Sequence, residues 1–355
     1  MNFDTVRLEL SNWYHNNKRD LPWRNIADPY KIWISEIILQ QTRVAQGYEY
    51  YMRFTDRFPT VESLAIAQED EVLKYWQGLG YYSRARNLHS AAKQIMGSFD
   101  GVFPNTYADV LSLKGIGTYT AAAICSFAYK QKYAVVDGNV YRVLARLFAI
   151  DTPIDSTYGK KMFQQLADDF LNVQSPAVHN QAIMEFGALQ CVPTNPDCTI
   201  CPLITHCLSY ESGLYKSLPV KEKKTKIRKR YFNYFVVYDE NSIFLKQRTE
   251  KDIWQQLYEF PLIETAGETS LETLIHSSEF KTFFGEVVDF EIMHSVKLPK
   301  HMLSHQHIFA QFIGLRVKQT SFSLPNCIVI SSSELEKYAI SRLTEIFLQN
   351  NPLIL

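Results

Sequence analysis

Two glycines stand on either side of Ile116, and an alanine-rich stretch follows them in the sequence LKGIGTYTAAAICSFAY. Because glycine lacks a side chain, Gly115 and Gly117 permit a tight turn that leaves amide N–H groups uncovered where a helix begins. Such a turn points several donors and the positive end of a helix dipole at one anion, such as a DNA phosphate. An ordinary helix connection would look the same, so the motif depends on its neighbours for its meaning.

Two carboxylic acids lie near this turn in the sequence. Asp137 precedes a predicted helix in AVVDGNVYRVLARL, where a capping role alone would explain it and would keep its pKa low. Glu36 is the one acid of the apolar helix KIWISEIILQQTRV, so it lies either at the edge of the apolar stripe or partly desolvated, with a pKa raised toward neutrality. One protonated and one ionised carboxyl are the pair that cleaves glycosidic bonds.

Four cysteines follow a C-x6-C-x2-C-x5-C pattern at Cys191, Cys198, Cys201 and Cys207. A disulfide framework is not expected, because the chain is no small secreted scaffold. Four thiolates form a soft donor set for zinc or for an iron–sulfur cluster. The loop has a single C-x2-C knuckle and wide outer spacings, which favour a [4Fe–4S] cluster over zinc. We expect the metal site to cross-link a loop that has little apolar core of its own.

These residues need helices to position them, and the first two hundred residues show recurring helix-length apolar segments, among them 61–75, with almost no strand-like alternation. Asp4, Thr118 and Asp137 are predicted to cap helices. After the basic run KEKKTKIRKR, aromatic and β-branched runs such as YFNYFVVY and VVDFEIMHSVKL (287–298) indicate strands, and helical signal returns near 270–283 and 334–349. We therefore expect a multidomain chain in which an α+β domain follows an all-α domain. The expected parts are a helical domain at 1–215, with a helix-hairpin-helix at about 108–128 and a cysteine loop at 191–207, a basic linker at 216–230, and the α+β domain at 231–355.

Composition narrows the class of protein. Hydrophobic residues make up 46% and aromatic residues 14%, which is typical of a globular chain. No apolar run is long enough to span a bilayer and no signal peptide is evident, so we expect a cytoplasmic protein without membrane contact. The formal net charge is zero, but the first 230 residues are net basic and the rest net acidic. The basic run is either a solvated linker or a strap that contacts phosphates.

Taken together, the G-x-G turn, the D-G-N-V helix start and the cysteine spacing resemble the endonuclease III superfamily of base-excision DNA glycosylases. The more specific resemblance is to the MutY branch, which removes adenine mispaired with 8-oxoguanine. It also rests on LPWRNIADPYKIWISEIILQQTRV and GLGYYSRARNL, and it is dense over residues 21–207. The resemblance implies double-stranded DNA with A:8-oxoguanine or A:G mispairs as the partner. We expect a monomer, associated with the nucleoid in a bacterium.

The resemblance implies roles for the two acids and for Tyr119. Glu36 would protonate N7 of a flipped-out adenine and then activate water, while Asp137 would stabilise the oxocarbenium-like sugar, electrostatically or through a transient covalent bond. Lyase members carry a lysine where this chain has Tyr119, and a phenol cannot form a Schiff base. Tyr119 would instead hydrogen-bond near Asp137. The resemblance also implies that Gln41 and Tyr81 enter the base stack as wedges. It places Arg24, Gln181 and Trp23 in the walls of the base pocket. For Trp23, an ordinary place in the core is the alternative.

The region from about 231 resembles the C-terminal domain of these glycosylases, which is related in fold to Nudix hydrolases. The stretch IWQQLYEFPLIE looks like the approach to a Nudix box, but no R-E-x-x-E-E follows, so a pyrophosphatase is not expected. In the family a Phe-Ser-His loop reads the oxidised guanine. Here Ser304 and His305 are kept, and Leu303 replaces the aromatic residue. The stretch VPTNPD between the first two cysteines lacks the basic residues that relatives place against DNA.

Two other functions share part of the pattern. An endonuclease III-like glycosylase/lyase acting on oxidised pyrimidines would share the hairpin and the cysteines, but it would carry a lysine at position 119 and would not need residues 231–355. A non-catalytic damaged-DNA binder would be expected to lose a carboxyl, and both Glu36 and Asp137 are present. We therefore expect a monofunctional adenine DNA glycosylase of base excision repair.

Overall fold

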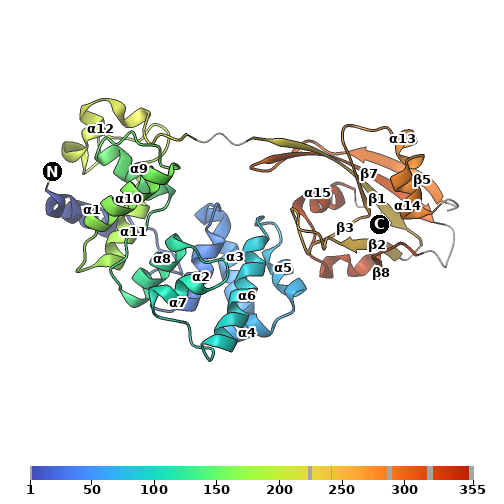
Figure 1. Cartoon of the computed structure of the whole chain (residues 1–355), viewed down its shortest axis with the longest axis horizontal. Coiled ribbons are helices and arrows are strands. Elements are labelled where there is room, and N and C mark those ends of the chain that lie inside the picture. The colour runs from blue at the N-terminus through green and yellow to red at the C-terminus, as the bar shows by residue number, and fades with distance from the viewer. Residues whose placement is uncertain (1, 223–225, 241, 286–289, 318–322, 352–355) are drawn as a thin grey trace. The chain divides into compact units, whose positions relative to one another are not determined.

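A computed structural model describes residues 2–222, 226–240, 242–285, 290–317 and 323–351 (Figure 1). The contacts within it divide the chain into two compact units. The helical unit comprises Met1–Ile66 and Ser90–Lys224, and the sheet unit comprises Ala67–His89 and Thr225–Leu355. Part of the basic run of the expected linker, at 223–225, lies outside the described residues.

Helices account for most of the first two hundred residues, as the sequence predicts. The segment 61–75, expected as one helix, forms two, because the backbone of Gln68 is extended between them. The helices are α1 (Phe3–Asn17), α2 (Pro29–Ile38), α3 (Val44–Arg57), α4 (Val61–Ile66), α5 (Glu69–Trp76), α6 (Ser83–Ser98), α7 (Tyr107–Ser112), α8 (Thr118–Tyr129), α9 (Gly138–Leu147), α10 (Thr157–Asp169), α11 (Pro176–Leu189) and α12 (Leu208–Glu211), with 3-10 turns at Ile204–His206 and Leu214–Lys216.

The expected helix-hairpin-helix is formed by α7 and α8. Between them Gly115 has a φ of 78°, a left-handed conformation that glycine adopts without a steric penalty. Gly117 lies at the N-terminal cap of α8, where the sequence analysis expected Thr118. From Thr120 to Ala128 every residue of α8 except Phe127 is buried, so its apolar composition places it deep in the helical unit.

The capping prediction for Asp137 is confirmed. Its side chain accepts hydrogen bonds from the backbone N–H groups of Asn139 and Val140 and so fixes the start of α9. By contrast, the cap of α1 is Asn2 rather than Asp4, which lies in the first turn. Helix α9 then packs against α11, and its buried face joins an apolar core that includes Phe163.

The sheet unit holds a mixed sheet of eight strands among the described residues, with the path β3-β2-β1-β7-β5. Strands β1 and β7 run parallel, and their paired residues alternate between two faces. Phe235 packs against Phe280 of α14 on one face, and Phe312 stacks on Phe347 of α15. The elements are β1 (Arg228–Tyr238), β2 (Ser242–Gln247), β3 (Tyr258–Glu259), β4 (Leu262–Thr265), α13 (Leu271–Ile275), α14 (Ser278–Phe284), β5 (Phe290–Lys297), β6 (His301–Met302), β7 (Gln306–Val317), β8 (Cys327–Ser331) and α15 (Arg342–Asn350), with a 3-10 helix at Ser332–Lys337.

Three details of the sheet unit differ from expectation or lie beyond description. The helical signal at 334–349 covers a 3-10 helix and α15, with β8 before them unpredicted. Residues 287–289 of the predicted strand lie outside the described residues.

Within the described ranges, every helix is too short or too polar to cross a membrane.

Candidate active site

A cleft of about 940 Å³ in the helical unit collects most of the predicted site residues. Helix α2 supplies Glu36, α8 supplies Tyr119, the start of α9 supplies Asp137, and α11 supplies Gln181. The walls also include four other residues that the sequence analysis named: Trp23, Arg24, Gln41 and Gly117. Residues from five separated segments of the chain therefore meet in one cleft that is large enough for a nucleotide.

Glu36 is buried, with 8% of its surface exposed, in a helix that is apolar on nearly every side. Burial raises the pKa of its carboxyl to about 7, and the negative charge of Asp137 acts in the same direction. The hydroxyl of Tyr119 and the charge of Arg24 oppose this rise. Of the two environments that the sequence left open for Glu36, the structure shows the desolvated one, and at neutral pH a large fraction of Glu36 carries a proton.

Tyr119 contacts a different acid from the one expected. Its hydroxyl donates a hydrogen bond of 2.8 Å to Oε2 of Glu36, whereas the sequence analysis placed it near Asp137. Burial, followed by the charges of Glu36 and Asp137, raises the pKa of the phenol well above its ordinary value. Tyr119 therefore stays neutral and acts as a hydrogen-bond donor to the carboxyl of Glu36.

Asp137 is held by three hydrogen bonds from its own helix. The amides of Asn139 and Val140 donate to Oδ1 at 2.9 and 2.8 Å, and Nδ2 of Asn139 donates to Oδ2 at 2.8 Å. The expectation of a low pKa is wrong, because burial raises the pKa of Asp137 above its ordinary value despite these bonds and the charge of Arg142. The bonds limit the rise and fix the carboxylate at one orientation.

Arg142 connects this region to two neighbouring segments. Its guanidinium donates to Oδ1 of Asn139 at 2.9 Å, to the carbonyl of Gly187 at 2.6 Å and to the carbonyl of Cys191 at 2.8 Å. These bonds run from the first turn of α9 to α11 and to the start of the cysteine loop. Neither Asn139 nor Arg142 was singled out from the sequence, where they look like ordinary residues of a helix.

A buried ion cluster forms another wall of the cleft. Glu185 is 1% exposed and accepts bonds from the backbone and guanidinium of Arg19 and from both terminal nitrogens of Arg24. Burial opposes its ionisation, but these bonds outweigh burial and hold the pKa of Glu185 at about 2. The sequence analysis missed Glu185, although it is a lone acid in an apolar helix, which is the signal that identified Glu36.

The remaining cleft residues combine packing with exposure to the cavity. Trp23 is largely buried and contacts Tyr51 edge-on at 5.0 Å, so it belongs both to the core and to the wall. Tyr14 donates a 2.8 Å hydrogen bond to Oε1 of Gln181 and orients that side chain. Gln41 has a φ of 57°, which a non-glycine residue adopts at a cost.

Tyr81, Ser304 and His305 lie together in the sheet unit. The hydroxyl of Tyr81 donates to Oγ of Ser304 at 3.1 Å, and that oxygen lies 3.0 Å from Nδ1 of His305. All three line a cavity of about 480 Å³, together with Leu303. Tyr81 is 42% exposed and has a φ of 47°, so the loop presents the ring in a costly backbone conformation.

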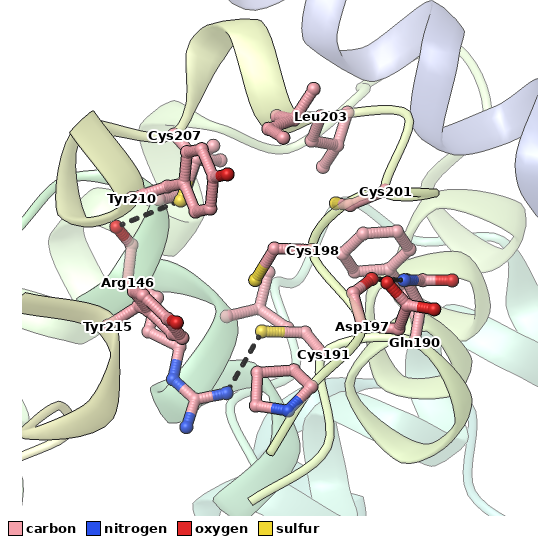
Figure 2. A pocket seen from close by; sticks show the side chains of 15 residues that line it. Arg146, Gln190, Cys191, Asp197, Cys198, Cys201, Leu203, Cys207, Tyr210 and Tyr215 are labelled. Carbon is pink, nitrogen blue, oxygen red and sulfur yellow. Dashed lines mark hydrogen bonds between the residues drawn. The ribbon is translucent and has the colours of Figure 1, made fainter. Parts of the chain in front are cut away.

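The four loop cysteines surround a second cavity in the helical unit (Figure 2). Nη1 of Arg146 lies 3.4 Å from the sulfur of Cys191, and its guanidinium also donates to the carbonyls of Val192 and Pro193. Burial raises the pKa of Cys201 to about 12, so a metal charge would be needed to hold these thiols ionised. Among the described side chains, no three His, Cys, Asp or Glu groups lie close enough together to hold one metal ion. Four thiols that line one cavity are a soft donor set for a zinc ion or for an iron–sulfur cluster.

Comparison with known proteins agrees with this geometry. A model of the HhH-GPD superfamily of base excision DNA repair proteins matches residues 34–168, and a NUDIX domain model matches residues 233–350. The adenine DNA glycosylase of Buchnera aphidicola subsp. Baizongia pistaciae is 40% identical over 254 residues, which cover 71% of this chain and 72% of that protein. That of Buchnera aphidicola subsp. Acyrthosiphon pisum is 33% identical over 315 residues, covering 88% and 85%.

The chain belongs to the adenine DNA glycosylases. It is therefore a DNA glycosylase enzyme of base excision repair, as the sequence predicts, and its Nudix-like domain is confirmed. A thermostable thymine-DNA glycosylase matches 59% of this chain and 97% of its own, with a TM-score of 0.55 and 28% identity. The match to endonuclease III, in a non-covalent complex with DNA, covers 60% of this chain and 99% of that chain, with a TM-score of 0.51 and 19% identity. The two proteins therefore share the fold.

Proposed function

We propose that this glycosylase hydrolyses the N-glycosidic bond of adenine mispaired with 8-oxoguanine, and of adenine mispaired with guanine, without cleaving the strand. The observation that carries the proposal is the neutral phenol of Tyr119 hydrogen-bonded to a raised-pKa Glu36, with Asp137 in the same cleft. An enzyme that forms a Schiff base needs an amine among its cleft residues near the sugar. Tyr119 supplies no nucleophilic nitrogen.

The chemical step uses the two carboxyls in opposite protonation states. Protonated Glu36 donates its proton to N7 of the extruded adenine, and the electron pair of the glycosidic bond leaves with the base. Ionised Asp137 stabilises the positive charge that develops on the sugar. Water then adds to C1′ and returns a proton to Glu36, so adenine and an abasic sugar are the only products.

Recognition of DNA is proposed for three other groups. The amides at Gly115 and Gly117 would hold a backbone phosphate at the start of α8. Gln41 in the helical unit and Tyr81 in the sheet unit would enter the base stack, in line with their costly backbone conformations. Ser304 and His305 would contact the oxidised guanine, and the bond from Tyr81 to Ser304 supports a shared role in that contact.

We also propose that Cys191, Cys198, Cys201 and Cys207 hold a [4Fe–4S] cluster. When bound, the cluster would cross-link the loop at 191–207. The protein's own contribution is the cation of Arg146, which lies beside the sulfur of Cys191 and opposes the burial that favours its thiol form. Iron and acid-labile sulfide should be about four each per chain, and a Cys198→Ser variant should contain less of both. Stoichiometric zinc without sulfide would contradict this assignment.

The experiment on function uses end-labelled duplexes with one adenine opposite 8-oxoguanine, guanine or thymine. Each reaction is read with and without hot alkali, for wild type and Tyr119→Lys. We expect breaks that require alkali, at adenine opposite 8-oxoguanine and guanine, and no reaction opposite thymine. Strand breaks by the wild type without alkali would contradict the assignment of Tyr119. The monomeric state and cytoplasmic location stay predictions.

A further inference from the structure

Gly187 occupies an unusual position in α11. It is buried inside a 14-residue helix whose C-terminal cap is Gln190, so it is not a helix-ending glycine. A glycine inside a helix costs about 0.5–1 kcal/mol relative to alanine, because the unfolded chain loses more freedom. No positive φ is recorded for Gly187 that would explain the choice. The neighbouring helix supplies the reason.

A side chain at Gly187 would collide with the first turn of α9. A Cβ atom built there would lie 2.7 Å from Cβ of Asn139, 3.0 Å from its carbonyl oxygen and 3.1 Å from its carbonyl carbon. Two of these three atoms are backbone, so a side-chain rotation cannot relieve the contact. Even one methyl group would therefore have to move the start of α9 away from α11.

The first turn of α9 is also where Asp137 is held. Asn139 supplies both its backbone N–H and its side-chain amide to that carboxylate. The carbonyl of Gly187 accepts from Arg142, which in turn donates to Oδ1 of Asn139. Gly187 thus touches Asn139 directly and is bonded to the cation that orients its amide.

We propose that Gly187 is a positioning residue, whose missing side chain lets α11 approach α9 closely enough to hold the amide of Asn139 on the carboxylate of Asp137. The inference rests on the proposed function of Asp137. It differs from a purely structural role, because it assigns Gly187 an effect on the ionisation and placement of one catalytic group.

The expected consequence has a definite sign. The titratable and charged groups that act on Asp137 or are acted on by it include Glu36 of α2, Tyr119 of α8 and Arg142 of α9. Hydrogen bonds from Asn139 lower the pKa of Asp137 against burial, which raises it. Loss of these bonds lets the pKa of Asp137 rise further. As the pH is lowered, the variant therefore loses ionised Asp137, and with it activity, at a higher pH than the wild type does.

The test compares three glycine-to-alanine variants of the full chain. Gly187→Ala tests the proposal. Gly97→Ala is the matched control, because a Cβ at this helical glycine of α6 meets nothing within 4 Å. Gly159→Ala tests packing damage elsewhere, because its Cβ would crowd the carbonyl of Pro153, away from the cleft. Adenine release is measured in single turnovers with enzyme in excess, over the whole pH range in which each variant stays folded. Urea unfolding and duplex binding are measured beside it.

For Gly187→Ala we expect a loss of release rate on the order of 10²-fold, because small displacements of reacting groups cost this much. The acidic limb of its pH profile should move upward, while duplex affinity stays near that of the wild type. Gly97→Ala should match the wild type, and Gly159→Ala should lose stability without moving the limb. A Gly187→Ala variant whose rate and acidic limb match the wild type, or whose rate falls only with its folded fraction, would overturn the proposal.

Two safeguards separate the outcomes. If Gly187→Ala does not fold, Asn139→Ala replaces it, since that change removes the amide without adding an atom to the helix crossing. An unmoved acidic limb in folded Asn139→Ala would then overturn the proposal. If the wild type itself releases no adenine, the proposed function is contradicted. If the wild type and Gly187→Ala release adenine at the same rate and with the same pH profile, only the inference about Gly187 is contradicted.

Discussion

At the scale of single residues, burial is the main cause of the raised pKa of Glu36, the proposed proton donor. A carboxyl in water would be ionised at neutral pH, but the apolar face of α2 and the charge of Asp137 raise the pKa of Glu36 to about 7. The packing of α2, whose residues from Ile32 to Ile38 are all buried, offsets the free-energy cost of this desolvation. The same burial raises the pKa of Asp137, whose helix cap then limits the rise.

The raised pKa of Glu36 sets the pH dependence of base release. In the proposed mechanism the donor is the protonated carboxyl, so the single-turnover rate should fall as the pH rises through about 7. It should also fall at low pH, where Asp137 takes up a proton. Rates measured over the whole pH range in which the protein stays folded should form a bell, and a rate that stays constant above pH 8 would show that Glu36 is not the proton donor.

Tyr119→Phe should move the basic side of that bell. The hydroxyl of Tyr119 stabilises the ionised form of Glu36 and lowers its pKa, so its removal should raise the pKa and shift the basic limb to higher pH. Tyr158→Phe is the control, because Tyr158 is 71% exposed. A downward shift in Tyr119→Phe would mean that the phenol favours the protonated carboxyl.

Residue-scale chemistry was partly predictable from the sequence. A lone acid in an apolar helix raised desolvation as one of two alternatives for Glu36, and its burial in the structure decides between them. The partner of Tyr119 did not, because it depends on how α2 and α8 approach each other and not on the spacing along the chain. Glu185 carried the same sign as Glu36, but its ion partners lie more than 160 residues away in sequence.

At the scale of elements, the ion cluster at Glu185 ties the segment before α2 to α11. Arg19 and Arg24 precede α2 and both bond to this one carboxylate of α11. Because the bonds to Glu185 join the segment before α2 to α11, the cluster fixes a wall of the cleft that neither segment could fix alone. Removing one partner leaves uncompensated buried charge on the others.

Glu185→Gln should therefore destabilise the protein by on the order of 3 kcal/mol in urea unfolding at pH 7. Glu62→Gln on the exposed side of α4 should change stability by less than about 0.5 kcal/mol. The pKa of Glu185 falls from its ordinary 4.5 to about 2 on folding, so the stabilisation is present above pH 4.5 and is lost as the pH falls through 2. Equal stability of wild type and Glu185→Gln at pH 7 would contradict this account.

Element boundaries were predicted best where local chemistry decides them. Asp137 could be identified as a cap because its side chain bonds only to Asn139 and Val140, which follow it closely in the sequence. The division of 61–75 into α4 and α5 lacked a proline or glycine signal, and it arises from the extended backbone of Gln68. Strand β8 was missed because it gains its place by pairing with β2, more than eighty residues earlier.

At the scale of the whole molecule, each unit has its own contacts and its own part in the proposed function. The helical unit holds the cleft and the cysteine loop, and the sheet unit holds Ser304 beside Tyr81. The two kinds of domain were predictable from texture alone. The grouping of residues 67–89 with the sheet unit was not, since it rests on long-range bonds such as Tyr258 Oη to Asp70 Oδ2 at 3.1 Å.

Ser304→Ala should weaken discrimination and leave the chemical step intact. A lost hydrogen bond of about 1 kcal/mol corresponds to a preference for 8-oxoguanine over guanine that is about fivefold lower. Ser278→Ala on the exposed start of α14 is the matched control. Rates on adenine opposite each base, measured with enzyme in excess, give the ratio. A ratio equal to that of the wild type would exclude Ser304 from recognition.

The most direct test of the central claim is release of free adenine from a duplex with one A:8-oxoguanine pair, measured by chromatography for wild type and Glu36→Gln. We predict one equivalent of free adenine per duplex from the wild type and a rate at least 10³-fold lower for Glu36→Gln, because the amide cannot donate the carboxyl proton. Adenine release by Glu36→Gln at the wild-type rate would contradict the assignment of Glu36 as the proton donor.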